Sequence, residues 1–184
     1  MSRLEIFAEG NPNTPIAVHE DGAAIAAALA GIGVHFERWR ANAALAEDAD
    51  DAAVMAAYAG AIERLKAEGG YQAVDVVRMK PDHPDRAMLR RKFLSEHVHG
   101  EDEVRFFVEG EGLFTLRADG HVFNMLCVRD DLISVPAGTR HWFDMGPAPR
   151  FTAIRLFTNP EGWVASFTGD DIADRFPRHE PVAA

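Results

Sequence analysis

The sequence has little cysteine and no long hydrophobic run. Cys127 is the only cysteine among 184 residues, so no disulfide can form within the chain. No apolar stretch approaches the ~20 residues that a membrane-spanning helix needs. The first 15 residues have neither the apolar core nor the small-residue cleavage site of a signal peptide. We therefore expect a soluble protein of the cytoplasm, without a membrane partner.

Positive charge is also scarce. The 19 Lys and Arg residues stand against 29 Asp and Glu residues, which gives a net charge of −10 with histidine neutral. An acidic surface repels the phosphates of nucleic acids and of anionic lipids. Nucleic acid is therefore not expected as a partner, whereas a small-molecule ligand remains open.

Several catalytic motifs are missing as well. The chain contains no glycine-rich phosphate loop, no nucleophile elbow and no CxxC pair. Cys127 lies in the apolar run HVFNMLCV, and we interpret it as a small buried hydrophobic residue rather than a nucleophile. The chemistry must therefore come from other side chains.

Helical patterns are present in the first third of the chain. The segment DGAAIAAALAGIG (21–33) carries apolar residues at steps of four and three, with Asp21 as a candidate N-cap. The segment DDAAVMAAYAGAIERLKAEGG (50–70) shows a second apolar stripe that ends at a glycine pair. The run VHFERW (34–39) between them predicts a strand.

From about residue 93 to 157, short β-type runs alternate with turn signals at roughly ten-residue spacing. This pattern is typical of a sandwich or barrel. We predict one mainly β domain over 1–184, in which a helix-rich part (1–92) packs on a barrel core and C-terminal segment (93–177). The tail after Phe176 is expected to be loose.

The segment EHVHGEDEVR (96–105) concentrates side chains that bind metals. His97 and His99 share one face if the segment is extended, and Glu103 and Arg105 have the same parity. Two imidazoles and a carboxylate form a facial ligand set that suits iron, nickel, cobalt or manganese. A closed structural zinc site is disfavoured, because no thiolate accompanies them.

A fourth ligand is expected from VPAGTRHWF (135–143), where a Pro/Gly turn leads to His141. Three imidazoles and one carboxylate leave two adjacent positions of an octahedral shell for a bidentate substrate. Arg105 would lower the pKa of a bound enol and favour its dianion. Four aromatic residues are candidates for an apolar wall: Phe93, Phe107, Trp142 and Phe143.

Each of these patterns also has a purely structural interpretation. A lone His-x-His pair is more often structural than a metal site, and Arg105 alone could equally form a structural salt bridge. Trp142 and Phe143 alone would be core residues. The Pro-x-Gly-x-x-His segment is what favours the metal site. The remaining histidines do not belong to a comparable cluster of ligand-type residues and are interpreted as surface or structural residues: His19, His35, His83, His121 and His179.

The segments HVHGEDEVRFFVEG and DLISVPAGTRHWFD resemble the two motifs of the cupin superfamily, with Asp144 where the second motif usually has Asn. The likeness is closer to the bacterial acireductone dioxygenases. It extends from residue 33 to 177 through GVHFERW, KFLSEHVHGEDEVRFFVEGEGLF, DLISVPAGTRHWFDMG and IRLFTNPEGWVASFTGDDIADRFP. This resemblance implies a cupin barrel, a double-stranded β-helix or jelly roll.

The resemblance also implies roles for individual residues. The metal ligands correspond to His97, His99, Glu103 and His141. Arg105 corresponds to a residue that helps to form the substrate dianion. Acidic neighbours credited with metal incorporation and with transmitting conformational change correspond to Glu96 and Asp102, and pocket positions correspond to Phe93, Phe143, Arg155 and Trp163. One Fe²⁺ or Ni²⁺ per monomer is the implied cofactor, and we expect a monomer.

The implied reaction belongs to methionine salvage. An acireductone, 1,2-dihydroxy-5-methylthiopent-1-en-3-one, reacts with O2. With iron the family makes 4-methylthio-2-oxobutanoate and formate, and with nickel it makes 3-methylthiopropanoate, formate and carbon monoxide. Two alternatives stay open at this point: another cupin metalloenzyme, or a cupin that binds a metal or ligand without catalysis.

Overall fold

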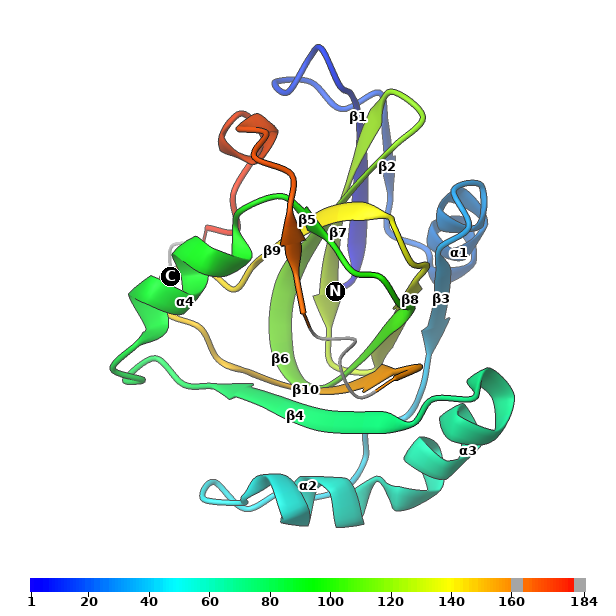
Figure 1. Ribbon diagram of the computed structural model, residues 1–184, viewed down its shortest axis with the longest axis vertical. Coiled ribbons are helices and arrows are strands. Elements are labelled where there is room, and N and C mark those ends of the chain that lie inside the picture. The colour runs from blue at the N-terminus through cyan, green and yellow to red at the C-terminus, as the bar shows by residue number, and fades with distance from the viewer. Residues whose placement is uncertain (160–163, 181–184) are drawn as a thin grey trace.

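The computed structural model describes residues 1–159 and 164–180, and it shows strands curving around a common interior with helices on the outside (Figure 1). The strands are β1 (Arg3–Ala8), β2 (Ala17–His19), β3 (His35–Arg38), β4 (Ala73–Met79), β5 (His97–Val98), β6 (Glu103–Ala118), β7 (His121–Val128), β8 (Asp131–Val135), β9 (Arg140–Asp144), β10 (Phe151–Phe157) and β11 (Ser166–Phe167). The helices are α1 (Gly22–Ala30), α2 (Asp51–Ala57), α3 (Ala59–Gly69), α4 (Arg86–Phe93) and a 3-10 turn, η1 (Ile172–Asp174).

The long strand β6 joins the two halves of the barrel. Its first half pairs with β10 and β8, and its second half pairs with β7 and β9, all antiparallel. The chain passes between the two halves at Gly110, which has φ 68°. A Cβ at this position would lie 1.8 Å from the carbonyl oxygen of Arg150. Only glycine fits this bend, and the bend lets one strand close both sheets.

Side chains alternate along β6 between two hydrophobic clusters. Val104, Phe106 and Val108 belong to the cluster that α2 and α3 cover on the outside of the sheet. Phe107 belongs to the interior cluster, in which Phe114, Phe143 and other apolar residues of both halves meet. Glu103 and Arg105 have the parity of Phe107, so the barrel interior is the place to which β6 delivers two of the predicted site residues.

The start of the first helix, and the outer ends of the second predicted helix, lie where the local sequence predicts. The side chain of Asp21 accepts hydrogen bonds from the backbone N–H groups of Ala23 and Ala24, and that of Asp50 from Ala53. Gly70, in the left-handed conformation, ends α3. The predicted second helix is interrupted at Tyr58, which separates α2 from α3.

The mainly β barrel is confirmed, but the position of the helices differs from the expectation. Helices α1 and α2 lie within the first third of the chain, whereas most of α3 and all of α4 lie beyond it. The same N-terminal part also supplies β1, β3 and β4, which pair with β7, β8 and β10. Residues 1–92 are therefore partly barrel wall, because edge strands of the sheets need partners for their backbone groups.

The tail after Phe176 is attached more firmly than expected. Phe176 is buried against Phe7 and Trp142, and the backbone N–H of His179 donates to Asp144 at 2.9 Å. Residues 181–184 lie outside the described part of the chain. Among the described residues, no helix is both long and apolar enough to cross a membrane.

Candidate metal centre

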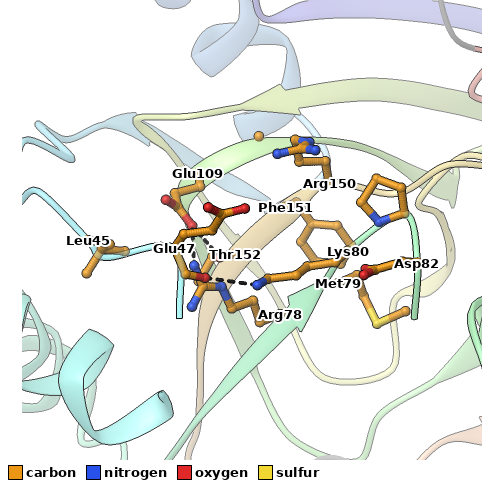
Figure 2. A pocket seen from close by; sticks show the side chains of 12 residues that line it. Leu45, Glu47, Arg78, Met79, Lys80, Asp82, Glu109, Arg150, Phe151 and Thr152 are labelled. Atoms are coloured by element: carbon orange, nitrogen blue, oxygen red, sulfur yellow. Dashed lines mark hydrogen bonds and ion pairs between the residues drawn. The ribbon is translucent and has the colours of Figure 1, made fainter. Parts of the chain in front are cut away.

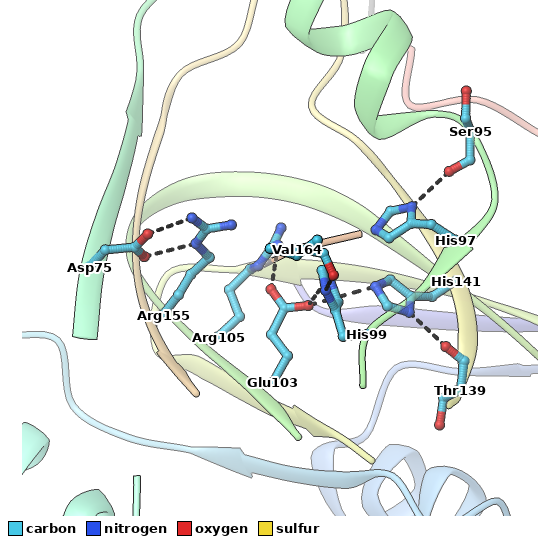
Figure 3. Close-up of polar contacts among 10 residues, drawn as sticks. All are labelled: Asp75, Ser95, His97, His99, Glu103, Arg105, Thr139, His141, Arg155 and Val164. Atoms are coloured by element: carbon cyan, nitrogen blue, oxygen red, sulfur yellow. Dashed lines mark hydrogen bonds and ion pairs between the residues drawn. The ribbon is translucent and has the colours of Figure 1, made fainter. Parts of the chain in front are cut away.

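Three imidazoles meet at the barrel interior (Figure 3). His97 on β5 and His141 on β9 are directly opposite each other in the strand pairing, and their ring centroids are 4.4 Å apart. His99 follows two residues after His97, with its ring 5.2 Å from that of His97 and 5.3 Å from that of His141. One nitrogen from each ring lies within 4.8 Å of the others, and all three residues are buried.

Each imidazole is oriented by a backbone carbonyl through its Nδ1 atom. The acceptors are Ser95 for His97 (2.7 Å), Thr139 for His141 (2.8 Å) and Val164 for His99 (3.2 Å). A carbonyl oxygen can only accept, so Nδ1 carries the proton and the Nε2 atom of each ring keeps its lone pair. This second hydrogen bond is the usual means of fixing a metal-binding histidine.

The carboxylate of Glu103 faces the same point. Its Oε1 accepts a hydrogen bond from Arg105 Nη2 at 2.6 Å. Its Oε2 is buried and receives no hydrogen bond from the described residues, yet it lies 3.5 Å from His99 Nε2 and 3.6 Å from His141 Nε2. A buried anionic oxygen without a donor is costly unless a cation completes it. An N3O set of this kind fits a divalent transition metal.

The protonation states suit a metal site at neutral pH. Burial alone would raise the pKa of Glu103, but the nearby charge of Arg105, and then His141 and His99, outweigh burial and lower this pKa to about 2. Burial lowers the pKa of His141 to about 3, and it also lowers the pKa of His97. Glu103 is therefore ionised while His97 and His141 are neutral, so these ligands need not lose a proton to bind an ion.

Arg105 is held in a fixed orientation beside the four side chains. Its guanidinium carbon lies 4.6 Å from the ring centroid of Phe143 and 5.1 Å from that of Phe114. Its Nε atom is buried and has no hydrogen-bond acceptor among the described residues. Among the described residues, the cation thus has one carboxylate partner, Glu103, two aromatic faces and a buried Nε–H donor that is not used.

Arg155 stands next to Arg105 across the β10–β6 pairing, but its charge is already balanced. Its Nε and Nη2 atoms donate to the two oxygens of Asp75 on β4, at 2.9 and 2.6 Å (Figure 3). The sequence did not predict that Asp75 lies near the site as the partner of Arg155. An acidic residue inside the apolar run AVDVV was a signal, but its partner depends on the strand register.

The aromatic residues of the predicted wall fall into two groups. Phe143 follows His141 on the same face of β9, and its ring lies 6.4 Å from that of Phe93 and 6.3 Å from that of Phe107. Trp142 points to the opposite face and packs on Phe176 outside the interior. The interpretation of Trp142 as part of the wall is therefore wrong, because neighbouring residues of a strand face opposite sides.

Two acidic neighbours of the ligands have structural partners. Glu96 is bound by Arg117 at 2.9 Å. Asp102 accepts a hydrogen bond from the backbone N–H of Ala137 at 2.8 Å, which ties the loop before Glu103 to the turn before His141. Trp163 lies outside the described residues.

A separate cavity of about 530 Å³ opens over β4 and β10, and none of the predicted metal ligands lines it (Figure 2). It contains three basic and three acidic side chains: Arg78, Lys80, Arg150, Glu47, Asp82 and Glu109. Lys80 donates to the carbonyl oxygen of Glu47, and Arg78 to that of Ala49. The charges are balanced, so this cavity has no evident preference for a charged ligand.

Comparison with known proteins relates the chain to one family over almost its full length. The model of the "ARD/ARD' family" matches residues 3–165. Acireductone dioxygenase of Parvibaculum lavamentivorans is 62% identical over 180 residues, covering 98% of each chain. That of Serratia proteamaculans is 62% identical over 178 residues, covering 97% of this chain and 99% of the relative.

A solved structure shows the same fold. Acireductone dioxygenase from Bacillus anthracis, which holds a cadmium ion in its active centre, superposes with a TM-score of 0.77 at 32% identity. The superposition covers 91% of this chain and 98% of that structure. A metal ion is thus present in the active centre of a relative that shares the barrel.

Proposed function

Since the chain belongs to the ARD/ARD' family and is a metal-dependent dioxygenase, we propose that it oxidises 1,2-dihydroxy-5-methylthiopent-1-en-3-one, an acireductone, with O2 in methionine salvage. The observation that carries the proposal is the buried Glu103 Oε2, which has no hydrogen-bond donor among the described residues and faces the Nε2 atoms of His99 and His141. A substrate with adjacent oxygens is the class of molecule that an open N3O metal site can hold.

The proposed metal ligands are the Nε2 atoms of His97, His99 and His141 and the Oε2 atom of Glu103. Three neutral imidazoles and one carboxylate suit Fe²⁺ or Ni²⁺, and the single cysteine, Cys127, is buried elsewhere in the core. When bound, the ion supplies Lewis acidity and holds the substrate oxygens side by side. All four ligands come from one chain, so we infer one metal ion per monomer. We also propose that the protein has a single domain and is cytoplasmic.

Arg105 is proposed to stabilise the dianion of the substrate. A fixed cation lowers the pKa of a neighbouring enol because it favours the charged form. The Nε atom of Arg105 is a buried donor without an acceptor among the described residues, and it is therefore suited to a substrate oxygen. Arg155 is less suited to this role, because its Nε and Nη2 atoms already donate hydrogen bonds to Asp75.

The surrounding side chains are proposed to hold the reactants and exclude water. Phe143 fixes the guanidinium of Arg105 and, with Phe93, offers an apolar surface to the methylthio tail. Only 8% of His97 and 8% of Arg105 is exposed, so charges in the site act in a poorly solvated environment. Asp102 and Glu96 are proposed to keep the two ligand segments in place.

The test is oxygen uptake with synthetic acireductone by metal-free protein that is reloaded with Fe²⁺ or Ni²⁺. The iron form should yield 4-methylthio-2-oxobutanoate and formate. The nickel form should yield 3-methylthiopropanoate, formate and carbon monoxide. Carbon monoxide is measured in the headspace, and the acids by NMR.

Two results would contradict different parts of the proposal. No metal-dependent oxygen uptake would reject the substrate. Identical products from both forms, at verified metal content, would reject the inference that the metal selects the outcome. The molar mass in solution, measured by light scattering, tests the expectation that the protein is a monomer.

A further inference from the structure

Arg117 binds three carboxylates that come from three distant parts of the chain. It lies near the end of β6, next to Leu116, the residue that pairs with His141. Its Nη1 atom donates to Glu96 at 2.9 Å and to Asp170 at 2.9 Å, and its Nη2 atom donates to Glu9. Glu9 follows β1, and Asp170 lies between β11 and η1. One guanidinium thus connects the N-terminal strand, the ligand segment and the C-terminal segment.

Glu96 depends on this arginine. It directly precedes His97, and its carboxylate is fully buried, with 0% of the side chain exposed. Among the described residues, Arg117 is the only cation within ion-pair distance of it. A buried carboxylate that loses its cationic partner carries an uncompensated charge, which favours movement of the side chain toward water. Such a movement would disturb the backbone that places His97.

The C-terminal segment around Asp170 touches the ligands directly. Phe167 on β11 pairs with His97 on β5, and their rings are 5.8 Å apart. The backbone N–H of Thr168 donates to the carbonyl of Glu96 at 3.1 Å. The carbonyl of Val164 accepts the hydrogen bond that orients His99. Strand β11 is only two residues long, so it needs support from outside the sheet to stay in this position.

Asp170 provides part of that support. Its Oδ2 atom accepts from Arg117, and its Oδ1 atom accepts from the backbone N–H of Ile172 at the start of η1. Ile172 is buried in the cluster of Phe7 and Trp142. The guanidinium at Asp170 and the apolar contact at Ile172, two residues apart, therefore both hold the C-terminal end of the segment that carries β11.

We propose that Arg117 is a positioning residue of the metal centre: by holding Glu96 and Asp170 together, it keeps His97 in place and the Val164 carbonyl on His99, and so slows the loss of the metal ion. The inference rests on the metal centre proposed above. Nothing in the sequence around FTLRADG pointed to Arg117, because its partners lie 21, 53 and 108 residues away.

The experiment measures the rate at which the Co²⁺-loaded protein releases its ion to excess EDTA, followed by the visible absorption of the bound ion. Removing residues that orient metal ligands typically costs about 10–100-fold in metal affinity. We expect Arg117→Met to release Co²⁺ about 10-fold faster than the wild type. Arg117→Lys should lie between them, because an ammonium group keeps the charge but cannot span three carboxylates. Asp170→Asn should show a smaller increase.

The matched control is Arg38→Met. Arg38 donates to the buried Asp131 at 3.0 Å, so this variant also removes an arginine from a buried carboxylate, but on β3, away from the ligands. Its release rate should stay within about two-fold of the wild type, whatever its thermal midpoint. The double variant Arg117→Met, Glu96→Gln should recover part of the slow release, because the stranded charge is gone.

The outcomes separate the hypotheses. A folded Arg117→Met protein that releases Co²⁺ at the wild-type rate overturns the inference, and so does an equal acceleration in Arg38→Met, which would indicate a general loss of stability. If Arg117→Met does not fold, Arg117→Lys and Asp170→Asn decide by the same criterion. Failure of the wild type to bind Co²⁺ would instead reject the metal centre itself.

Discussion

The substitution Glu103→Gln tests the metal centre most directly, because Oε2 is the anionic atom that faces His99 and His141 at 3.5 and 3.6 Å. The amide keeps the size of the side chain and an oxygen for Arg105, but it removes the negative charge. Residues that only orient ligands already affect metal affinity by about 10–100-fold. Loss of the charged ligand should therefore weaken binding by at least about 100-fold.

This loss has a calculable effect on stability. An ion present at 100 times its dissociation constant stabilises the folded protein by about 2.7 kcal/mol. A 100-fold weaker site at the same ion concentration would retain only about 0.4 kcal/mol. For a chain of this length, 1 kcal/mol corresponds to roughly 2–4 °C. The metal should thus raise the unfolding midpoint by about 5–11 °C in the wild type and by only about 1–2 °C in the variant.

The assay is thermal unfolding with and without Ni²⁺, and the quantity compared is the metal-induced shift. The metal-free variant will itself be destabilised, since the buried Arg105 loses a charged partner, and the difference measurement removes that contribution. Glu109→Gln is the matched control. Glu109 lies on the same strand but binds Thr152 and Arg78 instead. A full metal-induced shift in Glu103→Gln would refute the assignment of Glu103 as a ligand.

Three further predictions concern the surroundings of the site. Arg105→Met should still bind the metal but fail to form the substrate dianion, which anaerobic mixing reports by ultraviolet absorption; normal dianion formation would make Arg105 structural. Burial would raise the pKa of Asp144, but hydrogen bonds led by that of Arg90 outweigh it, and the net pKa is lowered. Asp144 therefore stabilises the fold above its unfolded pKa of about 4, and this contribution is lost as the pH falls through the lower folded pKa. The stability advantage over Asp144→Asn in urea unfolding should therefore shrink as the pH falls below about 4; a constant difference would contradict the pKa shift. Gly112→Ala would place a Cβ 2.3 Å from the Phe143 ring and should cost about 1–3 kcal/mol of unfolding free energy, with a lower kcat; unchanged values would show that the ring can move freely.

Local sequence determined the direction of side chains and the ends of helices. The two-residue period placed Glu103, Arg105 and Phe107 on one face of β6, and the structure has all three toward the interior. The cap at Asp21 was predicted because its side-chain oxygen satisfies free N–H groups of the next turn, and Asp50 caps α2 in the same way. The resemblance also named the three histidines that the fold brings together, while their role as ligands stays a prediction.

Tertiary structure alone decided which segments meet at the site. The pairing of β5 with β9 sets His97 opposite His141, and the same packing brings the Val164 carbonyl to His99 and Arg117 to Glu96. Trp142 was misplaced in the predicted wall although the two-residue period already separates it from His141 and Phe143; its cluster with Phe7 and Phe176 on the other face of β9 exists only in the tertiary structure. A period of two or of 3.6 residues encodes only where a side chain points relative to its own backbone. Which segment it then meets depends on strand register and on how the whole barrel closes, since these contacts join residues 21 to 65 positions apart.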